Sequence, residues 1–298
     1  MIRNQLEIRV CGLQRCGNHA IIDWIIQQFK GRRVCFLNNV HHGDQDPFSS
    51  AAQIFAYGIE GIPDGKVEVR SESLKTTEKD VLIYSYEDSA GRMLSFDSFL
   101  GSVYRPEFYT KREQYLGGSD RSVDILLLRD PYNFFASRIK KMEDRTGVKD
   151  VPTLIRYWKE MAEEALSMEK SQDPNKLFVG YNQWFADKKC RQNLCDFLGG
   201  TYSDESLGKV NPMGKGSSFD KTSVSKTLTP SKIVKKWYKF FDPRSYTRIP
   251  LYLNQMFGAR RMKVMDRWKA LKDDGRMDPV FADAELARLS QEIFGKVL

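Results

Sequence analysis

The sequence predicts an α/β fold in which helices cover both faces of a parallel sheet. Short apolar runs typical of buried strands alternate along the chain with segments of helical period. A glycine turn joins the first apolar run to the first helical segment. Polar residues follow the ends of several runs, which is where ligands bind in open parallel sheets. Together these observations indicate one composite site at the carboxyl edge of the sheet.

The expected elements follow from the apolar periodicity. Strands are expected over residues 6–13, 33–40, 81–86, 123–130 and 176–181. Helices are expected over 18–29, 131–143, 152–170 and 190–199, and loops over 44–66 and 89–121. The first helix has one apolar face and begins at Asn18, a residue type that often caps helices. Gly199 and Gly200 are expected to stop the last of these helices.

The chain of 298 residues is long enough for one or two domains, and we expect a single domain over 1–298. Its α/β core would occupy 1–221, and a mainly helical C-terminal extension would occupy 222–298. Residues 208–221 are rich in Gly, Ser and Lys and predict a linker or a loop that covers a ligand.

Composition narrows the possible functions. No apolar run approaches the roughly 20 residues that cross a bilayer, and we expect no signal peptide. Five cysteines without zinc-finger spacing favour buried thiols in a reducing cytoplasm. The net charge of +8 indicates either a solvated basic surface or a polyanionic ligand. No helix-turn-helix, zinc knuckle or RNP-type motif supports nucleic acid as that ligand, and a small, multiply phosphorylated cofactor fits equally well.

The strongest motif lies over residues 12–19, GLQRCGNH. Gly12 and Gly17 have the spacing of a phosphate-binding P-loop, and a helix N-terminus follows them. Asn18 and His19 replace the lysine and the magnesium-binding Ser or Thr, while the cation has moved into the loop as Arg15. The pattern predicts a P-loop-like turn that binds phosphate and a transfer that needs no metal. An ordinary glycine turn is the alternative.

The second motif is LLLRDP with a serine further on, which sets Arg129 at a strand end and Ser137 two helical turns beyond it. Arg129 could reach an anion in the cleft. Alone, a strand-end salt bridge and an ordinary helix serine explain the pattern as well.

Together the two motifs resemble the sulfotransferases that use 3′-phosphoadenosine 5′-phosphosulfate (PAPS). GLQRCGNHAIIDWI is similar to their 5′-phosphosulfate loop, especially in a bacterial and cyanobacterial branch, and LLLRDPYNFFASR to their 3′-phosphate segment. LFVGYNQWFAD and GKGSSFDK resemble a cofactor-contacting strand and a late loop. The resemblance implies PAPS as co-substrate, 3′-phosphoadenosine 5′-phosphate (PAP) as product, no metal, and cofactor contacts from Gln14, Arg15, Cys16, Gly17, Asn18, His19, Arg129, Ser137, Tyr181, Lys215, Gly216, Ser217, Ser218 and Phe219. Arg15 and Cys16 depart from the family's usual lysine and serine.

Sulfuryl transfer needs a cation beside the leaving phosphate and a base for the acceptor. Arg15 is expected on the leaving side. His41, His42 and Glu87 are the candidate bases, because each follows a strand that ends at the same sheet edge. Chemistry favours the histidines and the resemblance favours Glu87, so the choice stays open.

Two other functions remain possible from the sequence: a P-loop nucleotide-dependent kinase, and an inactive module that binds nucleotide or nucleic acid. For a sulfotransferase, the expected acceptor is a hydroxyl or an amine of a small molecule or sugar, in secondary metabolism. We expect a cytoplasmic enzyme without a nucleic-acid partner, and its oligomeric state is open. Aromatic residues in the two expected loops would face the acceptor: Phe48, Phe55, Tyr57, Phe96, Phe99, Tyr104, Phe108, Tyr109 and Tyr115. Acidic residues there, Asp44, Asp46 and Asp88, could receive a cationic acceptor.

Overall fold

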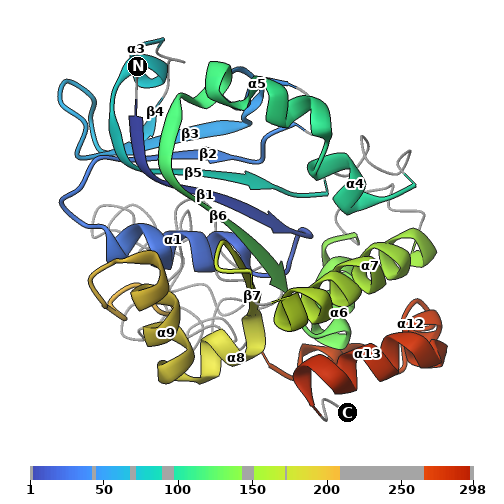
Figure 1. The fold of residues 1–298 in the computed structure, drawn as a ribbon. Helices are drawn as coiled ribbons and strands as arrows, with labels where there is room; N and C mark the ends of the chain where they lie inside the picture. The colour runs from blue at the N-terminus through green and yellow to red at the C-terminus, as the bar shows by residue number, and fades with distance from the viewer. Residues whose placement is uncertain are drawn as a thin grey trace, which may run out of the picture.

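A seven-stranded sheet with the order β4-β3-β2-β5-β1-β6-β7 forms the centre of the computed structural model (Figure 1). The structure describes residues 3–41, 45–67, 72–88, 97–142, 151–171, 173–208 and 265–295. The strands are β1 (Arg3–Gly12), β2 (Val34–Asn38), β3 (Gln53–Tyr57), β4 (Gly65–Val67), β5 (Lys79–Tyr86), β6 (Gly118–Leu128) and β7 (Lys176–Gly180). The helices are α1 (Asn18–Gln28), α2 (Pro47–Ser50), α3 (Glu72–Thr76), α4 (Phe99–Val103), α5 (Pro106–Leu116), α6 (Pro131–Met142), α7 (Val151–Ser171), α8 (Tyr181–Ala186), α9 (Lys188–Leu198), η4 (Arg267–Leu271), α12 (Asp278–Ala282) and α13 (Ala284–Phe294).

Five strands, β2, β5, β1, β6 and β7, run parallel to their neighbours, as expected. β3 and β4 were not expected, and they add to the β2 edge as antiparallel strands. The expected loop over 44–66 is therefore wrong, because it contains α2 and most of this antiparallel edge. The connection from β3 to β4, residues 58–64, is short enough for an antiparallel pair, whereas parallel neighbours need a longer crossover.

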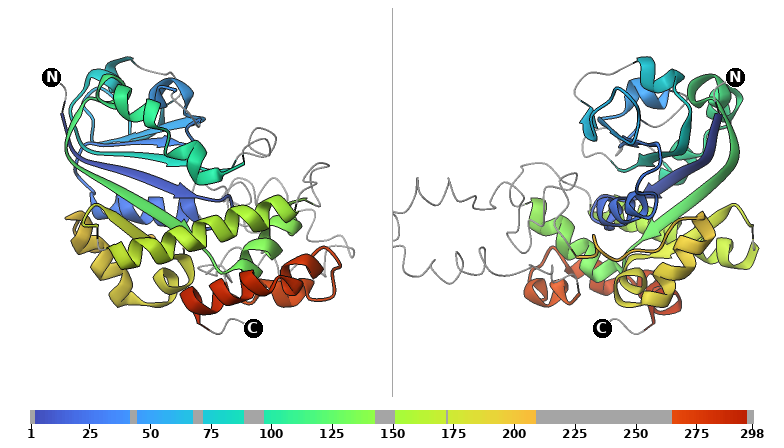
Figure 2. Two further views of the ribbon diagram at one scale, coloured as in Figure 1. Left: turned by 45° about the vertical axis from the view of Figure 1, so that its right-hand side comes forward. Right: turned by 90° about the vertical axis from the view of Figure 1, so that its left-hand side faces the viewer.

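Two hydrophobic layers cover the sheet, one on each face, which confirms the predicted α/β class (Figure 2). The outward-facing side chains of α1, α8 and α9 are polar, and their apolar sides pack with Ile8, Val10 and Ile83 of the sheet. Helices α4 to α7 pack on the other face with Cys11, Tyr84 and Leu126. Within the described residues, no helix combines the length and the apolar character that crossing a bilayer requires.

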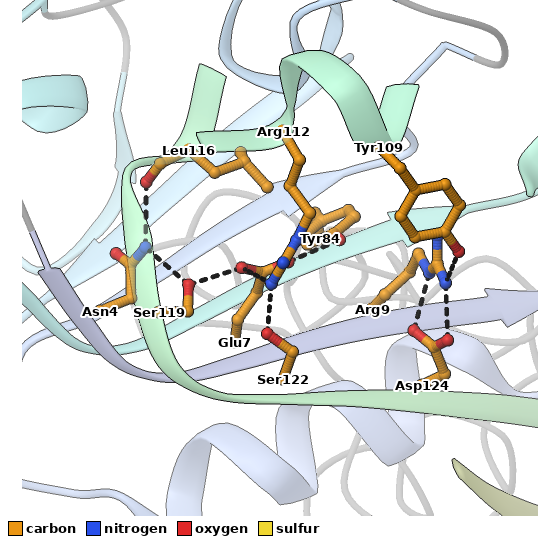
Figure 3. A network of polar contacts seen from close by, with 10 residues as sticks. All are labelled: Asn4, Glu7, Arg9, Tyr84, Tyr109, Arg112, Leu116, Ser119, Ser122 and Asp124. Atoms are coloured by element: carbon orange, nitrogen blue, oxygen red, sulfur yellow. Dashed lines mark hydrogen bonds and ion pairs between the residues drawn. The ribbon is translucent and has the colours of Figure 1, made fainter. Parts of the chain in front are cut away.

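A buried polar network holds α5 over β1 and β6 (Figure 3). Arg9 of β1 makes a two-pronged ion pair with Asp124 of β6, with distances of 2.8 and 2.6 Å, and also contacts the Tyr109 hydroxyl of α5. One turn along α5, Arg112 pairs in the same way with Glu7 of β1, at 2.8 and 2.6 Å. Buried charges persist in proteins when they are paired in this manner.

The expected loop over 89–121 is also wrong, because α4, α5 and the start of β6 lie within it. Several aromatic residues that the two expected loops were predicted to present to an acceptor belong to the core instead: Phe48, Phe55, Phe99 and Phe108 are each buried. Phe96 lies outside the described residues. Tyr109 is 47% exposed but packs against Arg9 and Phe108. The aromatic density therefore reflects packing around α4 and α5.

The described part of the C-terminal extension is helical, as expected. η4 and α12 pack on α6, and α13 packs on α7, so this segment covers the α6–α7 side of the core (Figure 1). The late glycine-rich stretch and the residues up to 264 lie outside the described residues. At the end of α9, Gly199 adopts a left-handed φ of 71° and caps the helix, as predicted.

Candidate active site

The parallel strands bring their carboxyl ends to one edge of the sheet, and four sequence motifs meet there. The turn after β1 leads into α1, Glu87 follows β5, Arg129 follows β6, and Tyr181 follows β7. The neighbouring order β5-β1-β6-β7 makes the positions after these strands adjacent. The composite edge expected from the sequence is therefore present.

The turn between β1 and α1 is tight and partly left-handed. The Cys16 N–H donates to the Leu13 carbonyl at 3.0 Å, and Gly17 and Arg15 have φ angles of 96° and 81°. A left-handed arginine is strained, and such strain concentrates at functional positions. The first bond within α1 runs from Ala20 N to Gly17 O at 2.9 Å, so the N–H groups before it have no acceptor inside the helix.

Both glycines of the motif are required by close contacts. A Cβ on Gly17 would overlap the ring of Tyr181, and a Cβ on Gly12 would overlap the Asn18 side chain. Tyr181, expected as the last residue of the strand over 176–181, is the first residue of α8, because β7 ends at Gly180. The loop therefore packs directly on the tyrosine that the sequence linked to the same ligand.

Asn18 does not cap α1, which corrects the sequence prediction. The helix cap is Gly17, and Asn18 is the first helical residue. Its Nδ2 group donates to the carbonyls of Gly12 and Leu13, at 3.0 and 3.2 Å, and to Glu87 Oε1 at 2.8 Å. Glu87 is buried, with 7% of its surface exposed. The Asn18 side chain therefore binds the Glu87 carboxylate and does not cap the helix. Glu87 is far away in the sequence, so local sequence rules could not predict this contact.

Several guanidinium groups act on the loop. Burial lowers the pKa of Arg15, the positive charges of Arg138, Arg267 and Arg129 lower it further, and Glu87 opposes them. This excess of positive charge at the turn is the electrostatic signature of an anion site.

Arg129 lies between the loop and β7. Its guanidinium carbon is 5.1 Å from the Tyr181 ring centroid, and its Nη1 is 3.5 Å from the Arg15 carbonyl oxygen. The Trp158 indole donates to the Arg129 carbonyl at 2.9 Å. Ser137 is 3% exposed on α6, the helix that begins two residues after Arg129. The second motif thus spans the end of β6 and the helix α6 that follows it, and its role in binding stays a prediction.

An amide network fixes the ends of β6 and β7. Asp130 accepts from Asn133 Nδ2 and from Asn182 Nδ2, at 3.0 and 2.7 Å, and its own N–H donates to Asn182. The Arg267 N–H donates to Asn133 Oδ1 at 2.6 Å. Arg267 therefore reaches the site from the C-terminal segment through α6.

The side chains of Cys16 and Asp88, which were expected to face the cofactor and a cationic acceptor, are both buried. Cys16 is fully buried, and burial raises the pKa of its thiol to about 12, so only its main chain can face a ligand. Asp88 is buried against Arg138 and is not available to a cationic acceptor. All five cysteines lie in the described residues as free thiols.

The structure describes His19 and His41, each of which lies beside a side-chain amide oxygen. His19 Nε2 lies 3.2 Å from Asn38 Oδ1, at the end of β2. His41 Nδ1 lies 3.2 Å from Gln45 Oε1. His42 and residues 215–219, Lys215, Gly216, Ser217, Ser218 and Phe219, lie outside the described residues. Among the residues that are described, no group of three His, Cys, Asp or Glu side chains could hold a metal ion.

Sequence reasoning missed four residues that shape the site: Asn133, Arg138, Asn182 and Arg267. Arg138 had a visible signal, because it follows Ser137 directly in the second motif. Arg267 had none, because it lies in the C-terminal extension, where the sequence shows no motif.

No family model matches the chain. No curated protein matches it either. Among solved structures, mouse sulfotransferase SULT7A1 complexed with PAP is 15% identical, with a TM-score of 0.42, over 92% of this chain and 90% of that one.

The sulfotransferase domain of a Synechococcus olefin synthase is 12% identical, with a TM-score of 0.42, over 81% of this chain and 96% of that one. Retinol dehydratase in a complex with retinol and PAP is 14% identical, with a TM-score of 0.39, over 97% of this chain and 80% of that one.

Proposed function

We propose that this chain is a PAPS-dependent sulfotransferase, which moves a sulfuryl group to a hydroxyl or amine of a small molecule or sugar. The observation that carries the proposal is the set of arginines around a glycine turn that lacks the Lys-Ser/Thr of nucleotide kinases. Arg138, Arg267 and Arg129 all contribute positive charge at Arg15. Arg15 and Arg129 also belong to the two motifs that resemble the family.

The residues at the sheet edge fit a ligand with two anionic ends. The turn over 12–19 supplies the N–H groups at the start of α1 and would hold the 5′-phosphosulfate. Arg129 and Ser137 would hold the 3′-phosphate. Tyr181 links the two groups of residues, since its ring lies against both Gly17 of the turn and the Arg129 guanidinium. Lys215 to Phe219 are proposed to complete the cofactor contacts.

PAPS supplies a sulfuryl group joined through an oxygen to its 5′-phosphate. In the transfer, the acceptor oxygen or nitrogen bonds to sulfur, the bond from sulfur to the bridging oxygen breaks, and the acceptor proton passes to a base. Arg15 would stabilise the charge that collects on the leaving phosphate. Glu87 is the base we favour, because its charge acts on Arg15 and both groups therefore lie near the reacting centre. His41 and His42 remain the competing bases.

We further propose that 1–298 acts as one catalytic unit, in the cytoplasm and in secondary metabolism. Small-molecule acceptors would be the partners, with neither nucleic acid nor a metal required for the transfer.

Nucleotide binding tests the cofactor directly. PAP should raise the melting temperature of the purified chain clearly more than 5′-AMP does, because only PAP engages Arg129 and Ser137. Arg129→Ala should remove that difference. Equal shifts from PAP and 5′-AMP in the wild-type chain would contradict the assignment of the 3′-phosphate.

Transfer itself is tested with ³⁵S-labelled PAPS and a panel of hydroxyl and amine acceptors, with and without EDTA. Label should move to an acceptor and survive chelation. Magnesium-dependent ATP turnover would instead support a kinase. Salt-sensitive binding of DNA or RNA without any turnover would support a nucleic-acid-binding module.

A further inference from the structure

An ion pair between Asp88 and Arg138 holds the turn from outside the two sequence motifs. Asp88 follows Glu87 at the end of β5, and Arg138 lies on α6. Their carboxylate and guanidinium groups are 2.5 Å apart, and the two side chains are only 5% and 6% exposed. Burial raises the pKa of the Asp88 carboxyl and the charge of Arg138 counters this shift, so each member stabilises the other's charge.

Both members of the pair also contact one residue of the turn, Gln14. Asp88 Oδ1 accepts from the Gln14 main-chain N–H at 2.5 Å. Arg138 Nη1 is 3.5 Å from the Gln14 carbonyl oxygen and 3.4 Å from its side-chain oxygen. The N–H and the C=O of Gln14 thus face opposite charges of one buried pair.

The position of this contact matters because Gln14 immediately precedes the left-handed Arg15. A strained backbone conformation persists only where its surroundings over-determine it. With both main-chain groups of Gln14 fixed, the direction of the following peptides is fixed as well, up to Gly17 and the first turn of α1. The ion pairs of Arg9 with Asp124 and of Arg112 with Glu7 are partly buried; they join β1 to β6 and α5 to β1, and neither includes a residue of the turn (Figure 3).

We propose that Asp88 and Arg138 are positioning residues for the 5′ end of the donor. The inference rests on the proposed function: the pair acts through the Gln14 main chain on the N–H groups of the turn, and does not itself touch the sulfuryl group. Geometry set at this distance affects turnover strongly, because misplacement by about 1 Å can cost roughly 10²-fold in rate.

The test separates the two ends of the donor with two mononucleotides, 5′-AMP and 3′-AMP, and with PAP. Asp88→Asn removes the negative charge of the pair. Arg138→Lys keeps the positive charge but loses the planar guanidinium group that can donate two parallel hydrogen bonds. Asp204→Asn is the control, because Asp204 accepts from Arg191 at 2.9 Å in a less buried ion pair that includes no residue of the turn.

Calorimetry should give about a tenfold weaker affinity of Asp88→Asn for 5′-AMP and PAP, with 3′-AMP within twofold of wild type. Turnover at saturating PAPS should fall by about 10²-fold. Arg138→Lys should lower the affinity for 5′-AMP and PAP and the turnover as well, but by smaller factors. Asp204→Asn should change neither the affinity nor the turnover. A parallel loss of 5′-AMP and 3′-AMP affinity, or no change in either, would overturn the inference.

A ligand-free measurement keeps this result distinct from failure of the proposed function. Amide hydrogen exchange over 14–18 should speed up in Asp88→Asn and Arg138→Lys, and should stay at the wild-type rate in Asp204→Asn. If the wild-type chain binds no adenine nucleotide, the proposed function is wrong. The rates of amide exchange over 14–18 still show whether the Asp88–Arg138 pair positions the turn. Unchanged exchange in both pair variants would overturn the positioning role whatever the ligand.

Discussion

The Asn18 amide donates to the Glu87 carboxylate at 2.8 Å, and this bond joins the start of α1 to the end of β5. The same amide also donates to the carbonyls that close the glycine turn. The proposed base and the proposed phosphate loop are therefore parts of one hydrogen-bonded unit. Removing the charge of Glu87 can be separated from breaking this unit, because a glutamine still offers an oxygen to Asn18.

That separation gives the first prediction. Glu87→Gln should lower the turnover number by roughly 10²–10⁴-fold, the usual range for loss of a general base, and should keep PAP affinity within a few fold. Single-turnover transfer and PAP calorimetry measure the two quantities. His41→Ala and His42→Ala are the comparisons, and each should stay near wild type.

The histidine alternative has a distinct signature. If His41 or His42 were the base, its alanine variant would carry the loss of turnover, and Glu87→Gln would stay near wild type. Wild-type rates in all three variants would show that neither strand end supplies a base.

Arg15 carries the second prediction. Arg15→Ala should lower turnover by on the order of 10²–10³-fold, as loss of one transition-state charge donor does. PAP affinity should fall less, since the N–H groups of the turn and Arg129 remain. Steady-state kinetics with labelled PAPS measure both effects. Arg33→Ala removes an arginine that pairs with Asp80 at the opposite edge of the sheet, and should leave turnover unchanged. A folded Arg15→Ala protein with wild-type turnover would remove Arg15 from the chemistry.

The first β-α unit was predictable because its signal is local. Apolar positions of strand and helical period surround the glycine turn, and β1 and α1 lie where that periodicity set them. The edge strands β3 and β4 were not predictable in the same way. They have five and three residues and lie in a turn-rich segment, so their conformation depends on the pairing of β3 with β2 and of β4 with β3.

The site residues likewise fall into those with a local sequence signal and those that depend on tertiary contacts. Arg15, Arg129 and Ser137 stand in compact motifs, and their spacing was visible in the chain. Asn18 was misread as a cap because its partner Glu87 is 69 residues away. Arg267 reaches the site only because η4 packs on α6, a tertiary contact with no local sequence pattern.

Gly17 and Gly31 give a matched pair for the third prediction. Both have left-handed φ angles, 96° and 85°, but an added Cβ overlaps Tyr181 at Gly17 and meets nothing within 4 Å at Gly31. Gly31→Ala should cost about 1 kcal/mol of unfolding free energy from backbone strain alone. Gly17→Ala should cost about 1–3 kcal/mol more, from overpacking, and should weaken PAP binding. Urea unfolding and calorimetry measure both, and equal costs would contradict the contact.

The last prediction concerns Asp23 on α1, whose pKa is raised to about 6 by burial. An acid with a raised folded-state pKa binds more protons when folded, so stability falls as pH rises from the unfolded pKa, about 3.9, to about 6. Asp23→Asn removes this loss. It should raise the free energy of unfolding by about 2 kcal/mol at pH 7.5 and by close to nothing below pH 4. Urea unfolding of both proteins across this range measures the difference. A constant gap at every pH would mean that Asp23 acts through packing, because only its ionisation makes the gap open with rising pH.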